Sequence, residues 1–304
     1  MGKQKGLKDC TKISGGADIA LNIIMILGTI ACILPLLLVF MSSITDEKTI
    51  TMYGYSLFPR KISFESYAYV FKDISVILRA YGITIFVTAV GSLLSLSIIS
   101  LYAYPLSRKD FRYRTTFTFI VFLTMLFNGG LVPWYMVYVN VLHVDDTIFA
   151  LILPYLMTPL YVLIMRTFFM TSVPDSIIEA ARIDGAGELQ TFIRIVLPLA
   201  KPALATIGLF NVLTYWNDWY SPLLFINSDR LFNLQYLLYR VDKAIMYLSS
   251  NAGSINNATQ IMANLPSQSA RMAMAVIAIG PIIFVYPFFQ KYFVEGLTIG
   301  SIKG

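Results

Sequence analysis

The sequence has few charged residues. Only 13% of its 304 residues are Asp, Glu, Lys or Arg, whereas a soluble domain has about 25%. Hydrophobic residues make up 57% of the chain, and its mean hydropathy is +0.69. Burying this much apolar surface in water is implausible, so the sequence predicts a protein that lies in a lipid bilayer. The net charge of +6 does not indicate nucleic-acid binding, because Lys and Arg cluster at the ends of the apolar segments.

Residues that perform chemistry are also scarce. The chain has two cysteines, Cys10 and Cys32, which give no disulfide framework, and one histidine, His143. One loop histidine without a His/Cys/carboxylate cluster indicates neither a metal site nor a Ser–His–Asp arrangement. The sequence also lacks G-x-x-x-x-G-K-[ST], the loop that cradles ATP phosphates. We therefore expect no enzyme activity and no cofactor in this chain.

Long apolar segments dominate what is present. A helix needs about 20 apolar residues to cross a bilayer, and six segments satisfy this length. The predicted spans are 19–43, 81–105, 116–139, 147–169, 202–225 and 272–292. The sequence therefore predicts an all-α membrane protein with a six-helix transmembrane domain at residues 19–292.

The distribution of Lys and Arg predicts the orientation of the spans, because cytoplasmic loops carry an excess of basic residues. Four lysines precede the first span and four basic residues follow the second. The loop between spans three and four has Asp145 and Asp146 but no Lys or Arg. We expect both termini in the cytoplasm and two long loops outside. The expected cytoplasmic parts are 1–18, 172–200 and 293–304, and the outer loops are 45–80 and 226–271.

A polar stretch, "SVPDSIIEAARIDGAGELQTFIRIVLP", lies between the fourth and fifth spans. Ser172 can cap a helix, and Asp175 complements the N-terminus of that helix. Gly185 stands where a helix ends in a residue with positive φ. A second helix then runs to about Pro198. The stretch at 172–200 therefore predicts two short amphipathic helices joined by a tight turn.

The two faces of the first short helix differ in polarity. The residues expected to face the core are Ile177, Ile178 and Ala181. Glu179 and Arg182 are expected to point to the cytosol. The simpler alternative is an ordinary solvated linker, although connections of this length are usually functional.

The stretch "EAARIDGAGELQTFIRIVLPLAKP" resembles the EAA motif of ABC-importer permeases, and every element of the motif is present. The matching residues are Glu179, Ala180, Ala181, Asp184, Gly185, Ala186, Phe192, Ile195, Leu197, Pro198 and Pro202. The resemblance covers nearly the whole chain. "FNGGLVPWYM", "WNDWYSPLLF" and "FVEGLTIGSIKG" are similar to the small permease of maltose-type transporters, and especially to permeases for complex or lyase-derived oligosaccharides.

The resemblance implies a type I ABC-importer permease in a bacterial cell membrane, surrounded by lipid. In that family the EAA helix lies in a cleft of the ATP-binding subunit and transmits its motion to the spans. The implied coupling residues are Glu179, Ala180, Ala181, Asp184, Gly185 and Ala186, with Glu179 facing a basic residue of the ATPase. The implied partners are a second permease, two ATP-binding subunits, an extracellular solute-binding lipoprotein and a sugar or oligosaccharide.

The fifth predicted span carries polar and aromatic residues at helical spacing. Asn211, Tyr215, Asp218 and Trp219 fall on one helical face. Aromatic rings stack on sugar faces, and Asn and Asp bind hydroxyl groups, so this face is a candidate substrate pathway that also includes Trp216. The alternative is an aromatic belt at the outer leaflet, with Asp218 as a helix-end contact.

Asn128 and the following glycines, Gly129 and Gly130, interrupt the third predicted span. Gly at membrane depth is tolerated where backbone lines a cavity or is buried in protein. A kink beside the pathway is one interpretation, which makes Asn128 a candidate pathway residue. Close helix packing through small residues is the other.

Two further segments have implied roles. The Asn/Ser-rich outer loop at 226–271 is either a docking surface for a binding protein or a loop without contacts. Its N-x-S/T match at Asn257 is attributed to chance. The C-terminal tail at 293–304 either runs between the ATPase subunits or is a disordered end.

A secondary transporter is the alternative function. That class usually shows inverted repeats and ion-coupling carboxylates at mid-membrane. Only Asp218 is a candidate for such a carboxylate, and no repeat is visible. A membrane enzyme is a more distant alternative, since no catalytic cluster is present.

Overall fold

The computed structural model describes residues 15–250, 268–283 and 287. Helices form nearly all of the regular structure of this part, and its only β feature is one isolated bridge between Thr45 and Ile62. The predicted all-α fold is confirmed. The chain divides into two units, Met1–Val70 with Asn256–Val276 and Phe71–Ile255 with Ile277–Gly304.

The smaller unit contains α1 (Gly15–Ser43), α2 (Glu47–Tyr53) and α3 (Glu65–Val70). Large apolar side chains on every face of α1 are exposed, which is typical of a helix surrounded by lipid or by other membrane helices. The Glu47 carboxylate accepts hydrogen bonds from the backbone N–H groups of Gln268 and Ser269, at 2.9 and 2.8 Å. Glu47 therefore caps the apolar helix Gln268–Ile283.

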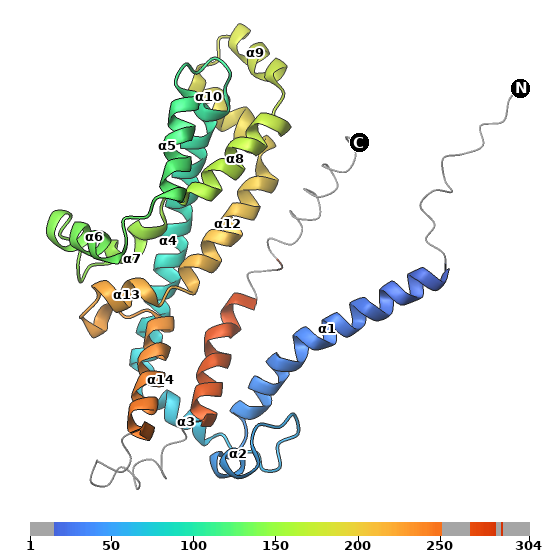
Figure 1. Ribbon diagram of the computed structural model, residues 1–304, viewed down its shortest axis with the longest axis vertical. Coiled ribbons are helices and arrows are strands. Elements are labelled where there is room, and N and C mark those ends of the chain that lie inside the picture. The colour runs from blue at the N-terminus through green and yellow to red at the C-terminus, as the bar shows by residue number, and fades with distance from the viewer. Residues whose placement is uncertain (1–14, 251–267, 284–286, 288–304) are drawn as a thin grey trace, which may run out of the picture. The chain divides into compact units, whose positions relative to one another are not determined.

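The larger unit is built on one long helix, α4 (Ile74–Ser107) (Figure 1). Its buried face packs along α8 (Pro159–Ser172) and α12 (Lys201–Trp216). Small residues let the helix backbones approach closely. Those buried on α4 are Ala80, Thr84, Thr88, Gly91, Ser92, Ser95, Ser100 and Ala103.

The third predicted span is not one helix. The chain forms α5 (Arg114–Leu126), then bends by 115° into α6 (Leu131–Met136) and a π-helix at Val137–Val141. At the bend, Gly130 has φ +87°, a conformation that residues with a side chain rarely adopt. The predicted interruption of the span at Asn128–Gly130 is confirmed, and the bend of 115° is sharper than a kink in one continuous helix.

The fourth and fifth predicted spans are also interrupted. A bend of 49° separates α7 (Phe149–Ile152) and its 3₁₀ turn from α8. After α12 ends, three residues intervene before α13 (Tyr220–Phe225). Among the described residues, two helices are long and apolar enough to cross a membrane, or up to five if each bent pair forms one span. The six-span count stays a prediction, because the sixth span at 272–292 lies partly outside the described residues.

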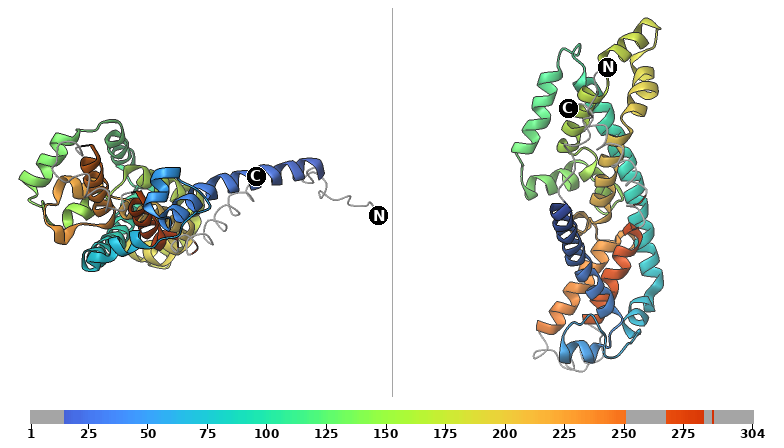
Figure 2. Two further views of the ribbon diagram at one scale, coloured as in Figure 1. Left: turned by 90° about the horizontal axis from the view of Figure 1, so that it is seen from below. Right: turned by 90° about the vertical axis from the view of Figure 1, so that its right-hand side faces the viewer.

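The two ends of the larger unit carry different elements (Figure 2). The short helices α9 (Asp175–Ile183) and α10 (Glu188–Thr191) lie at the end where α4 finishes. α14 (Leu234–Ser250) lies toward the other end, and α13 lies between the two ends, beside α7. A hydrogen bond of 2.8 Å from the Leu234 backbone N–H to the Thr84 hydroxyl joins α14 to α4.

Candidate functional site

The polar stretch forms the predicted helix pair. After α9, the chain turns and continues through α10, a π-helix at Phe192–Val196 and α11 (Leu197–Leu199). The expectation that Ser172 caps α9 was wrong, because α8 extends through Ser172 and the N-cap residue of α9 is Pro174.

Gly185 makes the turn between the two helices. Its φ is +82°, which confirms the predicted positive value. The Ala186 N–H donates to the Ala181 carbonyl at 2.9 Å, and the Gly185 N–H donates to the Arg182 carbonyl at 3.0 Å. These two bonds form a Schellman motif, which closes the C-terminus of a helix through a left-handed residue. The direction of the second helix is therefore fixed by the backbone.

One face of α9 packs on the larger unit, and the other face is exposed. Ile178 and Ala181 are buried as predicted, but Ile177 is exposed. The motif residues Glu179, Ala180, Asp184 and Gly185 are exposed, and Ala186 is half-buried. Two large apolar side chains beside them are also exposed, Ile183 at 87% and Leu189 at 64%. Large exposed apolar side chains at the end of a polar helix pair are typical of a protein-binding site.

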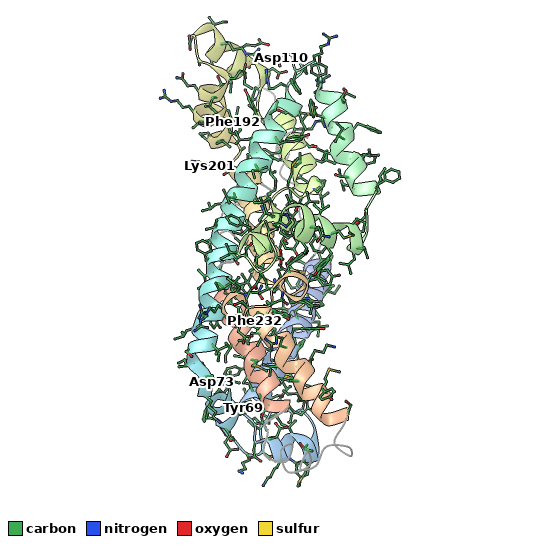
Figure 3. All side chains as sticks on the ribbon, turned by 90° about the vertical axis from the view of Figure 1, so that its left-hand side faces the viewer. Tyr69, Asp73, Asp110, Phe192, Lys201 and Phe232 are labelled. Atoms are coloured by element: carbon green, nitrogen blue, oxygen red, sulfur yellow. The ribbon has the colours of Figure 1, made fainter. Side chains whose placement is uncertain are left out.

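Later residues of the motif anchor the pair in the core. Phe192 is buried, and its ring centroid lies 5.1 Å from that of Tyr104 on α4. Val196 is buried in the same cluster, together with Ile99 and Met165. Figure 3 places Phe192 and Asp110 at the same end of the larger unit. The motif therefore combines an exposed helix with a buried base.

Ion pairs connect α9 to the loop that follows α4. The Arg182 guanidinium lies 2.5 Å from Asp110 and 2.6 Å from Glu188. At the other end of α9, Asp175 lies 3.1 Å from Arg108 and 3.0 Å from Lys109. The sequence identified Arg182 only as a cytosolic residue and did not identify these partners. Glu188 is six residues from Arg182, but the partners in the loop after α4 are more than 60 residues away in sequence, so opposite charge was the only signal for them.

The pairing changes the acidity of the carboxyl groups. The hydrogen bond from Arg182 holds the pKa of Asp110 below its usual value of 3.8. The hydrogen bond from Lys109 does the same for the pKa of Asp175. These carboxyl groups are therefore ionised at neutral pH and act as hydrogen-bond acceptors.

A cavity of about 470 Å³ lies beside this network. Its walls are mainly apolar, and its polar residues include Tyr104, whose hydroxyl donates to Glu188 at 3.0 Å. The lining residues are Leu101, Tyr104, Pro105, Arg108, Asp110, Phe111, Arg182, Glu188, Leu189 and Phe192.

The candidate pathway residues do not lie on one helix. Asn211 and Tyr215 belong to α12, but Asp218 and Trp219 lie in the break before α13. The predicted single face was wrong from Asp218 onward, because α12 ends at Trp216. Asp218 stabilises the start of the next helix, since its carboxylate accepts the backbone N–H groups of Tyr220 and Ser221, at 3.1 and 3.0 Å.

Tyr155, which no sequence pattern had singled out, connects two of these residues. Its hydroxyl donates to the Asp218 carboxylate at 3.1 Å, and its ring meets the Tyr215 ring edge-on at 5.5 Å. The Tyr215 hydroxyl donates to the Ile152 carbonyl at 2.7 Å. Asp218 and Tyr215 are buried, so in this conformation the chain itself satisfies the groups that were expected to bind sugar.

Asn211 is fully buried, at 0% exposure. Among the described residues, neither polar atom of its amide has a hydrogen-bond partner. The hydroxyl groups of Thr88 and Ser92 on α4 are buried and without a partner in the same sense. An unsatisfied buried amide costs about 1–3 kcal/mol, so this part of the α4–α12 contact is unusually polar for its burial.

The remaining candidates are placed separately. Asn128 is exposed, and its side-chain oxygen accepts the Gly130 N–H at 2.9 Å. Trp216 is buried and donates its indole N–H to the Ala278 carbonyl at 3.2 Å. Trp219 is exposed, and one face of its ring stacks on Tyr239 at 4.7 Å. Asn128 and Trp219 are therefore the candidates that are accessible in this conformation.

Other parts of the sequence prediction lie outside the described residues, namely Asn257 and its neighbours and the tail at 293–304. In the described ranges, no group of three or more His, Cys, Asp or Glu side chains could hold a metal ion.

Comparisons with known proteins agree with this architecture. The chain is 37% identical to Protein LplC of Bacillus subtilis (strain 168), over 92% of this chain and 93% of that protein. It is 35% identical to the polygalacturonan/rhamnogalacturonan transport system permease protein YtcP of the same organism, over 92% and 96%. A chain of a solved bacterial ABC transporter involved in the import of the acidic polysaccharide alginate matches with a TM-score of 0.77. The identity is 30%, and the match covers 91% of this chain and 96% of that chain. Residues 97–299 match the family described as "Binding-protein-dependent transport system inner membrane component", and the chain belongs to this family.

Proposed function

We propose that this chain is one permease subunit of an ABC importer for oligosaccharides, and that α9 docks on an ATP-binding partner. The observation that carries the proposal is the exposed tip of α9, where Glu179 and Ile183 face outward from a rigid, anchored helix pair. A charged residue at such an interface fixes register, and an exposed apolar residue supplies area for burial.

The proposed complex contains a second permease, two ATP-binding subunits and an extracellular solute-binding protein. ATP is assigned to the partner subunits, because the sequence has no P-loop and no cofactor is expected in this chain. The secondary-transporter alternative receives no support from the relatives, which are components of binding-protein-dependent systems.

The proposed substrate class is an acidic oligosaccharide. One relative is named for transport of polygalacturonan and rhamnogalacturonan, and the matching solved structure is of an importer of alginate, an acidic polysaccharide. Both names describe polymers that contain uronic acids. Relatives named for neutral sugars also match, for example an arabinooligosaccharide permease at 28% identity.

Uptake by the reconstituted complex tests both parts of the proposal. Proteoliposomes containing the permease pair, the ATPase and the binding protein should accumulate labelled galacturonate oligomers only when ATP is hydrolysed. Uptake should persist when a protonophore collapses the proton gradient. Carboxyl-reduced oligomers of the same length are the matched control, and equal uptake of both would contradict the acidic class while leaving the ABC mechanism intact. Uptake that follows the proton gradient without ATP would contradict the mechanism.

We propose that α9 and both termini face the cytoplasm. The basic loop that holds Arg108 and Lys109 supports this orientation, as does the absence of Lys and Arg from the loop with Asp145. Single cysteines placed at Glu188 and Asp145 should react with an impermeant maleimide from opposite sides of the membrane. Labelling of both from one side would contradict the orientation.

Six residues are proposed as contacts of the translocation pathway. They are Asn128, Asn211, Tyr215, Trp216, Asp218 and Trp219. Trp219 and Asn128 are exposed as the chain stands, whereas Asn211 reaches a substrate only in a conformation in which α4 and α12 separate locally. The buried Asn211 amide has no hydrogen-bond partner among the described residues. A hydrogen bond to substrate in the second conformation would remove the free-energy cost of leaving this amide unpaired, which supports such a conformation.

A further inference from the structure

We infer that Arg108, Lys109 and Asp110 form a clamp that transmits the motion of α9 to α4. These three consecutive residues directly follow the last residue of α4, Ser107. The inference rests on the proposed function, because the clamp matters only if α9 is moved by a partner that binds ATP.

The clamp holds α9 at both ends. Asp175 in the first turn of α9 pairs with Arg108 and Lys109. Arg182 in its last turn pairs with Asp110. Two attachment points separated along a helix prevent it from pivoting about either one. A force on α9 therefore displaces the end of α4 instead of rotating α9 alone.

The residues of the clamp are held in place by burial and by a neighbouring helix. The Arg108 side chain is only 11% exposed. From α8, the Arg166 Nε donates to the Leu106 carbonyl at the end of α4, at 3.0 Å. The loop that carries the clamp is therefore fixed to two membrane helices and is not a flexible connection.

Arg182 also links the two halves of the helix pair. Its guanidinium binds Asp110 and Glu188 together, and Glu188 accepts the Tyr104 hydroxyl of α4. The planar guanidinium suits such a double contact, whereas a lysine presents a single point charge. Through this one side chain, α9, α10 and α4 are joined across the Gly185 turn.

Because α4 packs on other membrane helices, a displacement at the clamp also changes contacts far from it. This helix runs the length of the larger unit, and its buried face packs on both α8 and α12 (Figure 1). Displacing its cytoplasmic end shifts the contact with α12, where Asn211, Thr88 and Ser92 are buried and find no hydrogen-bond partner in the described part of the chain. A path of packed and ion-paired residues thus connects the exposed α9 with the polar region inside the membrane domain.

The test compares coupling in the reconstituted complex, measured as ATP molecules hydrolysed per oligosaccharide imported. The variants are Asp110→Asn and Arg182→Gln, and the matched control is Arg112→Gln. Arg112 lies in the same loop, has its guanidinium over the Tyr113 ring at 5.7 Å, and makes none of the ion pairs found among the described residues. We expect the ratio to rise about fivefold or more in the two clamp variants, as for a typical coupling between sites, and to stay at the wild-type value in Arg112→Gln.

A triple charge reversal separates coupling from general damage. Asp110→Lys, Arg182→Glu and Glu188→Lys together restore both attractions with opposite sign, and the ratio should return toward the wild-type value. Purified complex yield is measured for every variant. If Arg182→Gln lowers yield, Arg182→Lys replaces it, because lysine keeps the charge but loses the double contact.

Two outcomes would overturn the clamp. One is a wild-type ratio in both Asp110→Asn and Arg182→Gln. The other is a raised ratio that the triple reversal leaves unchanged, since the residues would then act by another route. Failure of the proposed function is a different result, because it would appear as absent ATP-driven uptake in the wild-type complex.

Discussion

The contact between Gly91 on α4 and the Tyr215 ring on α12 makes one substitution especially informative, Gly91→Ala. A Cβ at position 91 would lie 2.6, 2.7 and 2.9 Å from three atoms of that ring. Ordinary contacts begin at about 3.4 Å, so the ring or a helix must move by several tenths of an ångström. The ring has little freedom to do so, because it is fully buried and its hydroxyl donates to the Ile152 carbonyl at 2.7 Å.

The expected loss of stability has two parts. Overpacking a well-packed core costs about 1–3 kcal/mol. Breaking the Tyr215–Ile152 hydrogen bond costs about 1 kcal/mol more. Alanine is favoured over glycine inside a helix by about 1 kcal/mol, which offsets part of the loss. Gly82→Ala on the same helix is the control, because it receives the same gain and its Cβ would meet nothing within 4 Å.

The measurement is the melting temperature of the purified complex, followed by intrinsic fluorescence. The difference between the two variants removes the helix-propensity term and leaves about 2–4 kcal/mol. For a domain of this size, that corresponds to roughly 4–16 °C. Adding Tyr215→Leu to Gly91→Ala should recover part of the difference, since residues in contact are coupled. If Gly91→Ala and Gly82→Ala melt within about 1 °C of each other, the close α4–α12 approach is wrong.

Three further predictions follow from the site. Gly185→Val should weaken association with the ATPase in pull-down assays, because its φ of +82° is strained for a β-branched residue, and Gly185→Asn should lose less. Asn211→Ala should change the uptake KM or the sugar preference at normal complex yield. Asp218→Asn should change the same quantities and also lower the yield, because its carboxylate accepts the first N–H groups of α13. Wild-type kinetics with poor yield in both variants would contradict the pathway role of these residues. Finally, the hydrogen bond from Arg182 lowers the pKa of Asp110 below its usual 3.8. The ion pair between Asp110 and Arg182 therefore stabilises the fold fully above pH 3.8, and this stabilisation is lost as the pH falls through the lowered pKa of the folded state. The melting difference between wild type and Asp110→Asn should therefore be constant from about pH 8 to 5 and narrow below about pH 4, and a narrowing that begins near neutral pH would contradict this assignment.

The sequence predicted the helix pair well, because its signals are local. Gly185 needs only its own backbone conformation to end α9, and the polar face of α9 follows from helical spacing. The bends were underestimated for the opposite reason. An apolar run looks the same whether or not the chain turns by 115° within it, and Gly130 indicated a kink without giving its angle.

Long-range contacts could not be predicted from one sequence. Asp110 and Arg182 are 72 residues apart, and Tyr155 and Asp218 are 63 apart. Their partnership depends on the packing of α4, α8 and α12, which no local pattern specifies. The single-face prediction for the fifth span failed because it assumed a continuous helix, whereas the Asp218 carboxylate stabilises the start of a new one.

The most direct test of the central claim is oligosaccharide uptake together with ATP hydrolysis in proteoliposomes carrying Glu179→Lys. Glu179 is exposed on α9, so reversing its charge should leave the permease folded and the complex detectable. The account predicts that uptake falls strongly while ATP hydrolysis is lost or continues without transport, and that Glu179→Gln has a smaller effect. Wild-type uptake per ATP hydrolysed in Glu179→Lys would contradict the claim that α9 couples this permease to its ATPase.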